Sequence, residues 1–537
     1  IFFSTINNHT LKNSLRWLLS CLSGILLVAA WPDYPFTWLI FVAWIPILFL
    51  AVEPTRKITW FGQVFLTMLI WNTGTTWWIW NSTDVGTIAA IIANSLLMCV
   101  PWLGYRNFMR QYGTRAGYSA LVFFWMTFEL IHLNWQISWP WLHLGNVFCM
   151  HPSWVRWYEI TGIGGGTLLV LIINICLFDV FRAWLQKQPI LSKRPALYTL
   201  IVLVCFLISY NRYRELSPTP STTSPGNVVV VQPNIDPYQK FSITTLGEQI
   251  NGLVTLTEQQ IDSNTRLVVW PETAMSAGDW QHNTAANTYY QPIFALLDRH
   301  PKVALLSGIE LFVNYGKEKT SPTARIDANG NYYDVMNAAM LAQFNQPLQF
   351  YYKSKLVPGV ETMPTYLRFL APVFEQFGGT SGSYGKSTNP VVLQNSDCPY
   401  KSAPIICYES IYGEYTGGYV KQGANILTII TNDGWWRNTP GHRQHLQLAR
   451  LRAIETGKWV VRSANTGISA IIDPQGNIIQ NLPWAKAGAL KYAVPVTDHV
   501  SVYAKAGDWI YYLMSFMAVL ALSWHSWQWL KKRLARK

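Results

Sequence analysis

The sequence predicts a protein in two parts: an α-helical membrane region of about eight spans, and an α/β domain outside the membrane. Long apolar runs fill the first ~210 residues and return near the C-terminus. Between them lies a stretch of ordinary soluble composition, in which short apolar runs alternate with helical patterns. Half of the 537 residues are hydrophobic and only 13% are charged, against roughly 25% charged residues in a typical soluble protein.

Eight apolar runs are candidates for membrane spans, because each approaches the roughly 20 residues that a helix needs to cross the hydrocarbon core. The many Trp residues near the ends of these runs indicate an interfacial aromatic belt. Glu129 lies inside the fifth run, where an acid is either functional or paired structurally with a neighbouring helix. The runs cover residues 14–31, 35–52, 58–80, 85–105, 116–135, 162–185, 196–211 and 507–530.

The same pattern predicts the domain boundaries. A seven-span region covers residues 1–211, a Pro/Ser/Thr-rich linker covers 212–226, and the α/β domain covers 227–500. The eighth span and a basic tail occupy 505–537. One set of loops holds sixteen Lys and Arg residues and the opposite set holds four. Because cytoplasmic loops carry the excess, we expect both termini in the cytoplasm and the α/β domain on the other side.

Composition argues against several classes of function. The net charge is +13, but the basic residues cluster in short loops beside apolar runs, which indicates membrane topology rather than nucleic-acid binding. The seven cysteines are odd in number and irregularly spaced, so they predict no disulfide framework and no metal site, although a Cys398–Cys407 bond remains an alternative. His442 and His445 have no third ligand nearby, so we expect packing or hydrogen bonding there.

The α/β region contains five apolar runs that predict buried strands, separated by helical patterns. Strands that alternate with helices predict a layered α/β fold. The predicted helices cover residues 242–261, with a Ser N-cap candidate, and 442–457, which ends at Gly. The predicted strands cover residues 227–233, 266–272, 302–310, 403–409 and 425–433.

Three predicted strand ends each carry one reactive group: Glu272, Lys353 and Cys407. A thiol attacks as the thiolate, so it needs a base to take its proton, and a carboxylate can do this. An ammonium, together with a backbone N–H at the Cys, can hold the oxyanion of a tetrahedral intermediate. The three groups together predict an acyl-thioester on Cys407, with Glu272 as the base and Lys353 as the stabiliser.

Each of these residues also has an ordinary structural interpretation when taken alone. A Cys after an apolar strand is usually a small core residue, and a Glu after Trp-Pro is usually a solvated loop residue. Lys353 could be an edge-strand charge. Lys355 competes with it for the catalytic role, because residues that alternate along a strand point to the same face.

The order of several motifs resembles that of the carbon–nitrogen hydrolase, or nitrilase, superfamily. The motifs are WPE (270–272), YxKxxLVP (351–358), CYES (407–410), TNDGWW (431–436) and the segment 442–476. The placement of this domain between apolar spans, with QPNI (232–235) and WPWL (139–142), is similar to the apolipoprotein N-acyltransferase branch. The resemblance implies an αββα sandwich joined to an eight-helix membrane base.

The resemblance also implies roles for individual residues. Glu272 matches the general base, Lys353 the stabiliser and Cys407 the acylated nucleophile. Lys355 stands where the family usually has His, Gly359-Val360 where it has Phe-Gly, and Phe241 where it commonly has Trp. Further positions match residues that support the Lys (Glu361) or flank the nucleophile (Tyr408 and Glu409), and Trp435 matches an aromatic at the lipid entrance. Trp435, Trp436 and Phe241 are the candidates for lipid or substrate contact, with core packing as the alternative for the two Trp residues.

The implied activity is transfer of an acyl chain from a phospholipid, through a Cys thioester, to the α-amino group of the N-terminal diacylglyceryl-cysteine of an apolipoprotein. It implies a bacterial cytoplasmic (inner) membrane, a periplasmic catalytic domain, and no cofactor, metal or nucleic acid. A membrane-tethered amidase or hydrolase of the same fold is the main alternative, and only the second substrate distinguishes the two. A transporter with an external binding domain is a weaker one, because the spans lack a dense set of charges. A non-catalytic scaffold is weaker still, because all three reactive groups are present.

Overall fold

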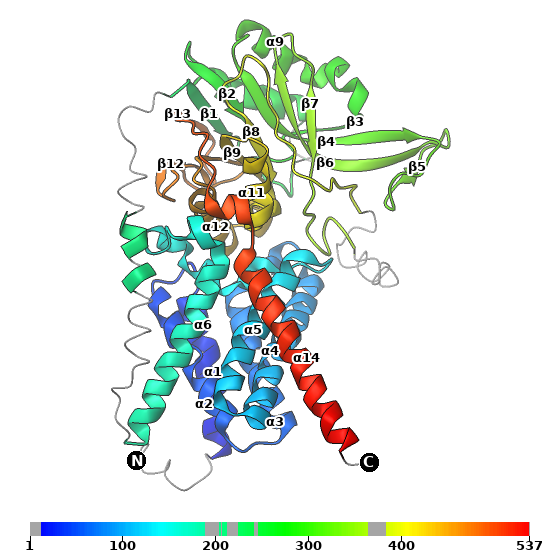
Figure 1. The fold of residues 1–537 in the computed structure, drawn as a ribbon. Coiled ribbons are helices and arrows are strands. Elements are labelled where there is room, and N and C mark those ends of the chain that lie inside the picture. The colour runs from blue at the N-terminus through cyan, green and yellow to red at the C-terminus, as the bar shows by residue number, and fades with distance from the viewer. Residues whose placement is uncertain are drawn as a thin grey trace. The chain divides into compact units, whose positions relative to one another are not determined.

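The structure is a computed structural model that describes residues 12–187, 203–205, 207–211, 224–240, 245–363 and 383–535 (Figure 1). The chain divides into two compact units. The first comprises Ile1–Trp77, Thr87–Tyr210 and Asp508–Lys537. The second comprises Asn211–Gly507 together with Trp78–Gly86, a short segment from the N-terminal half.

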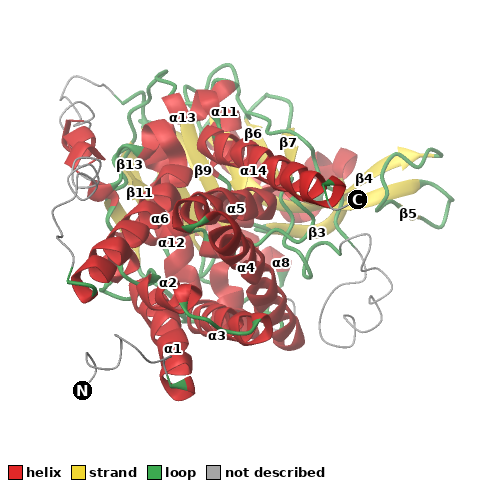
Figure 2. Cartoon of the chain, turned by 60° about the horizontal axis from the view of Figure 1, so that its bottom comes forward, coloured by secondary structure: helices red, strands yellow, loops and turns green. Residues whose placement is uncertain are grey.

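The first unit is helical and contains no strand in its described residues (Figure 2). Four of its helices, α1, α4, α5 and α6, are long and apolar enough to cross a membrane. The helices are α1 (Asn13–Ala30), α2 (Ile45–Val52), α3 (Lys57–Thr76), α4 (Asp84–Tyr112), α5 (Thr114–Asn134), α6 (Tyr158–Leu185) and α14 (Trp509–Leu534).

One predicted span differs from the structure. Residues 35–52 were expected as one helix, but a 3-10 turn at Thr37–Phe41 precedes the eight-residue helix α2. Pro46 stands in the first turn of α2, where a proline is compatible with a helix start but not with a helix that continues through it. The predicted seventh span, 196–211, lies largely outside the described residues.

Some Trp residues of this unit are packed inside it, whereas others, such as Trp38 and Trp527, are exposed. Trp44 is fully buried, and its ring centroid lies 4.8 Å from that of Trp102 and 4.6 Å from that of Trp125. Trp71 is also fully buried and lies 5.2 Å from Trp31. Ring pairs at these spacings stabilise a core beyond the area they bury, so here Trp packs helix against helix.

Glu129 on α5 has the structural role that the sequence left open. It is fully buried, and its carboxylate accepts hydrogen bonds from four groups. Trp125 Nε1 and the backbone N of Leu144 donate to Oε1 at 2.9 and 2.8 Å. Thr167 on α6 and Tyr511 on α14 donate to Oε2 at 2.7 and 2.6 Å. The acid therefore joins three helices and one loop of the first unit.

The second unit contains two β-sheets. The larger has the order β13-β1-β2-β4-β6-β5, with β3 paired to β4 and β7 to β6, and the smaller has the order β12-β11-β10-β9-β8. β1, β2 and β4 run parallel to one another, as do β8, β9 and β10. The strands are β1 (Asn227–Gln232), β2 (Thr265–Val269), β3 (Met275–Trp280), β4 (Ala304–Gly316), β5 (Arg325–Ile326), β6 (Tyr332–Gln343), β7 (Gln349–Tyr352), β8 (Ser402–Ile406), β9 (Ile426–Thr431), β10 (Val460–Ala464), β11 (Ser469–Ile472), β12 (Ile478–Leu482) and β13 (Gly488–Ala493).

Side chains that alternate along the strands enter two different cores, so the unit forms a sandwich of four layers. In β1, Val228 and Val230 belong to the core shared by the two sheets, whereas Val229 and Val231 belong to a core beneath helices. Residues of α8 (Leu246–Glu258) and α9 (Gln291–Arg299) cover the larger sheet. Those of α11 (Gly413–Lys421) and α12 (Pro440–Thr456) cover the smaller one, and a short helix, α13 (Val502–Ala506), packs on α11. The predicted αββα layering is thus present.

The five predicted strands and two predicted helices of this unit are confirmed, as β1, β2, β4, β8, β9, α8 and α12. One detail was wrong. The N-cap of α8 is Thr245 rather than a Ser, because Thr245 forms a capping box with Glu248, each side chain bonding the other's backbone N–H. Ser242 lies outside the described residues.

Candidate active site

The two sheets bring the three predicted reactive residues together. Glu272 follows β2, Lys353 directly follows β7, and Cys407 directly follows β8. Lys353 Nζ lies 3.1 Å from Glu272 Oε1, and the Cys407 thiol interacts electrostatically with both groups. All three side chains are buried. Residues separated by 81 and 54 positions in the sequence therefore form one site.

Cys407 has an unusual backbone conformation. It opens a 3-10 turn, Cys407–Ile411, and its φ of +50° lies in the left-handed region that non-glycine residues rarely adopt. Its carbonyl oxygen accepts hydrogen bonds from Ser410 Oγ at 2.7 Å and from His445 Nε2 at 3.2 Å. Strained residues of this kind persist where the surroundings fix them, and they cluster at active sites.

The charges around the thiol determine its resting state. Burial raises the pKa of Cys407 well above the ordinary value, Glu272 raises it further, and Lys353 lowers it. Burial alone would lower the pKa of Lys353, but Glu272 and Glu361 raise it well above the ordinary value. At neutral pH the site therefore holds a protonated thiol beside an ammonium, so attack needs a base within the site. Glu272 is placed to be that base.

Asn337 on β6 is a site residue that the sequence analysis missed. Its Nδ2 donates to Glu272 Oε1 at 2.8 Å and to Glu361 Oε1 at 3.0 Å. The backbone N of Lys353 donates to the Asn337 carbonyl at 2.9 Å. Asn337 thus fixes both carboxylates and the strand end that carries the ammonium. A buried Asn in the apolar run VMNAAML was the available signal.

The structure distinguishes the two competing lysines. Lys353 Nζ contacts both carboxylates, whereas Lys355 Nζ lies over the rings of Tyr412 and Tyr415, at 5.0 and 5.6 Å from their centroids. The expectation that Lys353 and Lys355 point to the same face of a strand was wrong. β7 ends at Tyr352, so residues 353–355 do not alternate as strand residues do.

Glu361, Glu409 and Tyr408, the expected supporting residues, are all buried or half-buried near the three reactive groups. Glu361 contacts Lys353 Nζ at 2.8 Å and also accepts from the backbone N of Val357 at 2.9 Å. Glu409 is fully buried and ties the loop after β7 to the end of β8. It accepts hydrogen bonds from the backbone N of Ser354 at 2.6 Å and from the backbone N of Ile406 at 2.8 Å.

Tyr408 is buried against the ring of Tyr412, and the two ring centroids lie 5.3 Å apart.

Glu409 gives stability a pH dependence. Burial raises its pKa from 4.5 to about 7, against the opposing effect of the hydrogen bond from Tyr351. The folded state therefore binds this proton more tightly than the unfolded chain. Protonated Glu409 contributes fully to stability below pH 4.5, and about 3 kcal/mol of this contribution is lost as pH rises through 7.

We expect Glu409→Gln, which is uncharged at every pH, to remove this pH-dependent loss of stability from melting temperatures measured between pH 5 and pH 8. An unchanged slope would show that Glu409 does not carry it.

A buried polar network lies beneath the nucleophile. His445 Nε2 lies 2.8 Å from Ser410 Oγ, and its Nδ1 lies 2.9 Å from Asp433 Oδ1. Arg462 also pairs with Asp433. Burial opposes ionisation of Asp433, but His445 and Arg462 hold the pKa of this carboxyl well below its usual range. His445 is thus engaged in hydrogen bonds, and His442 stacks on Trp484 with ring centroids 4.0 Å apart.

The candidates for lipid or substrate contact differ in how exposed their side chains are. Trp435 is 44% exposed and packs edge-on against Tyr238, with centroids 5.4 Å apart. Trp436 is half-buried and packs on Trp78, with ring centroids 4.7 Å apart. Phe241 lies outside the described residues. Cys398 and Cys407 are both free thiols, so the alternative disulfide is absent.

Comparisons with known proteins identify the families that the chain matches. Residues 227–502, just over half of the chain, match the family described as carbon-nitrogen hydrolase. Residues 23–176 match the apolipoprotein N-acyltransferase N-terminal domain. The chain is 29% identical over 524 residues to an apolipoprotein N-acyltransferase of Chlorobaculum tepidum, covering 95% of this chain and 96% of the relative.

Two further similarities differ in extent. An apolipoprotein N-acyltransferase of Azotobacter vinelandii is 27% identical, with 94% of each chain covered. Among solved structures, Nit3 of Saccharomyces cerevisiae, a member of the nitrilase superfamily, is 16% identical with a TM-score of 0.36. That match covers 51% of this chain and 92% of Nit3.

Proposed function

We infer that this chain, which belongs to the carbon–nitrogen hydrolase family and to its apolipoprotein N-acyltransferase branch, N-acylates lipoproteins through a thioester on Cys407. The observation that carries this inference is the buried constellation of Glu272, Lys353 and Cys407 in a chain whose described residues also include four helices long and apolar enough to cross a membrane. The donor is a phospholipid and the acceptor is an apolipoprotein with an N-terminal diacylglyceryl-cysteine.

In the first step, Glu272 accepts the thiol proton and the Cys407 thiolate attacks the ester carbonyl of the phospholipid. The Lys353 ammonium and a backbone N–H at the nucleophile hold the oxyanion of the tetrahedral intermediate. The intermediate collapses to the thioester. The lysophospholipid leaves as an alcohol, with the proton that Glu272 returns to it.

In the second step, the α-amine of the diacylglyceryl-cysteine attacks the thioester carbonyl. Glu272 takes a proton from the attacking nitrogen, and Lys353 again holds the oxyanion. The carbon–sulfur bond breaks, an amide forms, and the Cys407 thiolate regains the proton from Glu272. Water must be kept from the thioester during this interval, because hydrolysis would release a free fatty acid.

The location follows from the substrates, both of which are anchored in a membrane. We place the chain in the bacterial cytoplasmic membrane, with both termini in the cytoplasm and the catalytic unit on the periplasmic side. Support comes from the sixteen-to-four distribution of Lys and Arg residues. Transporter and scaffold functions lose support, because the chain belongs to a family of enzymes and carries the three reactive groups.

The proposal is tested with the purified full-length protein, a phospholipid with isotope-labelled acyl chains, and a diacylglyceryl-cysteinyl peptide. The expected product is a peptide that carries one labelled acyl group in a hydroxylamine-resistant amide. The same peptide with an acetylated α-amine is the matched control and should remain unmodified. Labelled fatty acid without labelled peptide would identify a hydrolase instead.

Asn337→Leu should slow acyl transfer about 100-fold, because small displacements of catalytic groups have effects of this size. The variant loses the donor that fixes Glu272 and Glu361. The measurement is the rate of peptide acylation. Asn251→Leu, which changes an exposed Asn on α8, should keep the wild-type rate. Equal rates for the two variants would contradict the role given to Asn337.

A further inference from the structure

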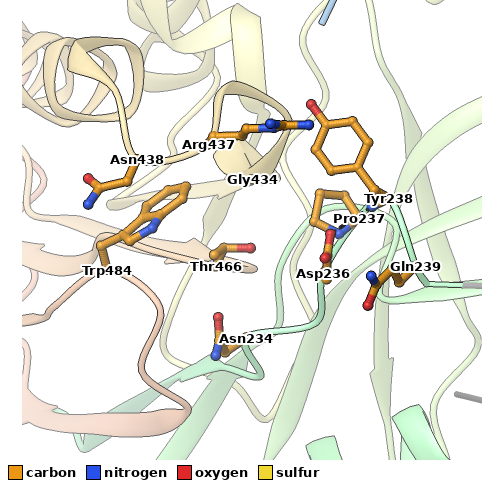
Figure 3. Close-up of a pocket in the computed structure, with 10 residues that line it drawn as sticks. All are labelled: Asn234, Asp236, Pro237, Tyr238, Gln239, Gly434, Arg437, Asn438, Thr466 and Trp484. Carbon is orange, nitrogen blue, oxygen red and sulfur yellow. Dashed lines mark hydrogen bonds between the residues drawn. The ribbon is translucent and has the colours of Figure 1, made fainter. Parts of the chain in front are cut away.

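A cavity of about 470 Å³, lined by polar, charged and apolar side chains, lies within the second unit (Figure 3). Its walls come from the loops that follow β1, β9, β10 and β12. A short chain of contacts connects it to the site. The backbone N of Asn432 donates to Glu272 Oε2 at 3.1 Å, and Asn465 Nδ2 donates to Asn432 Oδ1 at 3.0 Å. The next residue, Thr466, lines the cavity.

Arg437 supplies a positive charge from a backbone conformation that disfavours it. Its φ of 54° and ψ of −165° lie close to a region that is essentially restricted to glycine. Its guanidinium is exposed and lies 5.2 Å from the ring centroid of Tyr238. In the part of the chain that the structure describes, no carboxylate forms a salt bridge with it. A long cationic side chain at a position suited to glycine is consistent with a binding role.

Thr466 supplies a hydroxyl without a partner. The residue is 8% exposed, and among the described residues its Oγ1 forms no hydrogen bond. Figure 3 shows this side chain directed into the cavity, between Trp484 and Asp236. Buried hydroxyls normally have partners, so a lone one in a cavity wall points to a ligand. The facing wall is Gly434, where a Cβ would lie 2.6 Å from Thr466 Oγ1.

The cavity also holds one fixed negative charge. Asp236 Oδ1 accepts from the backbone N of Tyr238 at 2.9 Å. With Arg437 in the same cavity, the two charges suit a ligand that has an anionic centre at one end and hydrogen-bond donors at the other. A phosphodiester with an alcohol or amine substituent has this form.

The rim of the cavity is hydrogen-bonded to the segment that connects two apolar helices. Tyr238 Oη donates to the carbonyl oxygens of Asn81 and Trp435, both at 2.7 Å. Asn81 lies in the short connection between α3, which ends at Thr76, and α4, which begins at Asp84. Tyr238, a residue of the cavity wall, is thus hydrogen-bonded to a segment that runs directly into a helix apolar enough to cross a membrane, which favours a lipid headgroup over a free phosphate.

We propose that this cavity binds the phosphodiester headgroup of the donor phospholipid, with Arg437 and Thr466 donating hydrogen bonds to the phosphate oxygens. This inference rests on the proposed acyl transfer and deepens it, because it assigns the part of the donor that leaves as lysophospholipid. The acyl ester then lies toward Cys407, and the headgroup lies on the far side of Asn432 and Asn465.

The test measures acylation of Cys407 in the full-length protein by intact mass, with phosphatidylglycerol and with a diacylglycerol of identical chains. The wild type should prefer the phospholipid. Arg437→Gly and Thr466→Val should each lower the rate with phosphatidylglycerol about tenfold, since each removes a hydrogen bond to a charged group. The ratio of the rate with phosphatidylglycerol to the rate with diacylglycerol should therefore fall in both variants. Arg437→Gly should melt no lower than the wild type, because glycine fits this backbone. Arg325→Gln, which changes an exposed Arg on β5, should keep the wild-type preference.

The outcomes separate the two proposals. Acylation by phospholipid, with the wild-type preference retained in both variants, would overturn the headgroup site and leave acyl transfer intact. A wild type that phospholipid does not acylate would overturn the proposed function, and this inference with it. Inorganic phosphate that inhibits the wild type as strongly as glycerophosphoglycerol would identify a free-phosphate site and overturn the headgroup assignment.

Discussion

Cys407→Ala should abolish the acyl-enzyme and lower peptide acylation by about 10⁴-fold or more, as removal of a nucleophile does in other covalent enzymes. The thiol is buried beside Glu272 and Lys353, and the backbone carbonyl of Cys407 accepts hydrogen bonds from Ser410 and His445, so the thiol is held in place for attack. The measurement is intact mass after incubation with phospholipid, followed by hydroxylamine treatment. Wild-type protein should carry one hydroxylamine-sensitive acyl group and the variant none.

Cys398→Ala is the matched control for that experiment. Cys398 is also a free, buried thiol of the core between the two sheets, and its thiol contacts the backbone carbonyl of Arg266 at 3.7 Å and the backbone of Tyr400. Burial raises the pKa of both thiols, to about 11 for Cys398, but Glu272 acts on Cys407 and is not among the groups that act on Cys398. We expect this variant to form the adduct as the wild type does. An adduct that persists in Cys407→Ala and disappears in Cys398→Ala would reassign the nucleophile.

Lys353→Met should have two large effects. It leaves Glu272 and Glu361 facing each other without the ammonium that both contact, which typically costs about 3–5 kcal/mol of stability. It also removes the charge that holds the oxyanion, which should lower kcat about 10²–10³-fold. Melting curves measure the first effect, and acylation rates at a temperature where the variant remains folded measure the second.

Lys355→Met controls for the loss of a lysine in the same loop. Its ammonium packs on two tyrosine rings rather than on the carboxylates, and contacts of this kind contribute roughly 0.5–2 kcal/mol. We therefore expect a small loss of stability and a kcat close to that of the wild type. The assignment of Lys353 would be wrong if Lys355→Met lost kcat and Lys353→Met retained it.

Much of the fold follows from local sequence patterns. The run NVVVVQ has apolar residues on both faces because β1 lies between two cores, and this is why it was recognisable as a buried strand. β2 and β8, the strands that precede Glu272 and Cys407, are also apolar runs with buried centres. Their order along the chain, with the motif around Lys353, allowed the site to be predicted before its geometry was known.

Other features depend on contacts that no local pattern encodes. Asn337 is distant in sequence from Glu272, and only the pairing of β6 with β4 and β7 brings it to the carboxylates. The choice between Lys353 and Lys355 depended on where β7 ends. In the helical unit, residues 35–52 had the composition of a span but contain a turn before Pro46.

The central claim is that Cys407 carries an acyl group which an amine, rather than water, removes. The most direct test is to isolate the acyl-enzyme, remove free lipid, and follow its decay with and without a diacylglyceryl-cysteinyl peptide. The peptide should accelerate the decay by at least about tenfold, equivalent to about 1.4 kcal/mol, and the acyl group should be recovered as the peptide amide. Decay at the same rate with and without peptide, with recovery as free fatty acid, would contradict it.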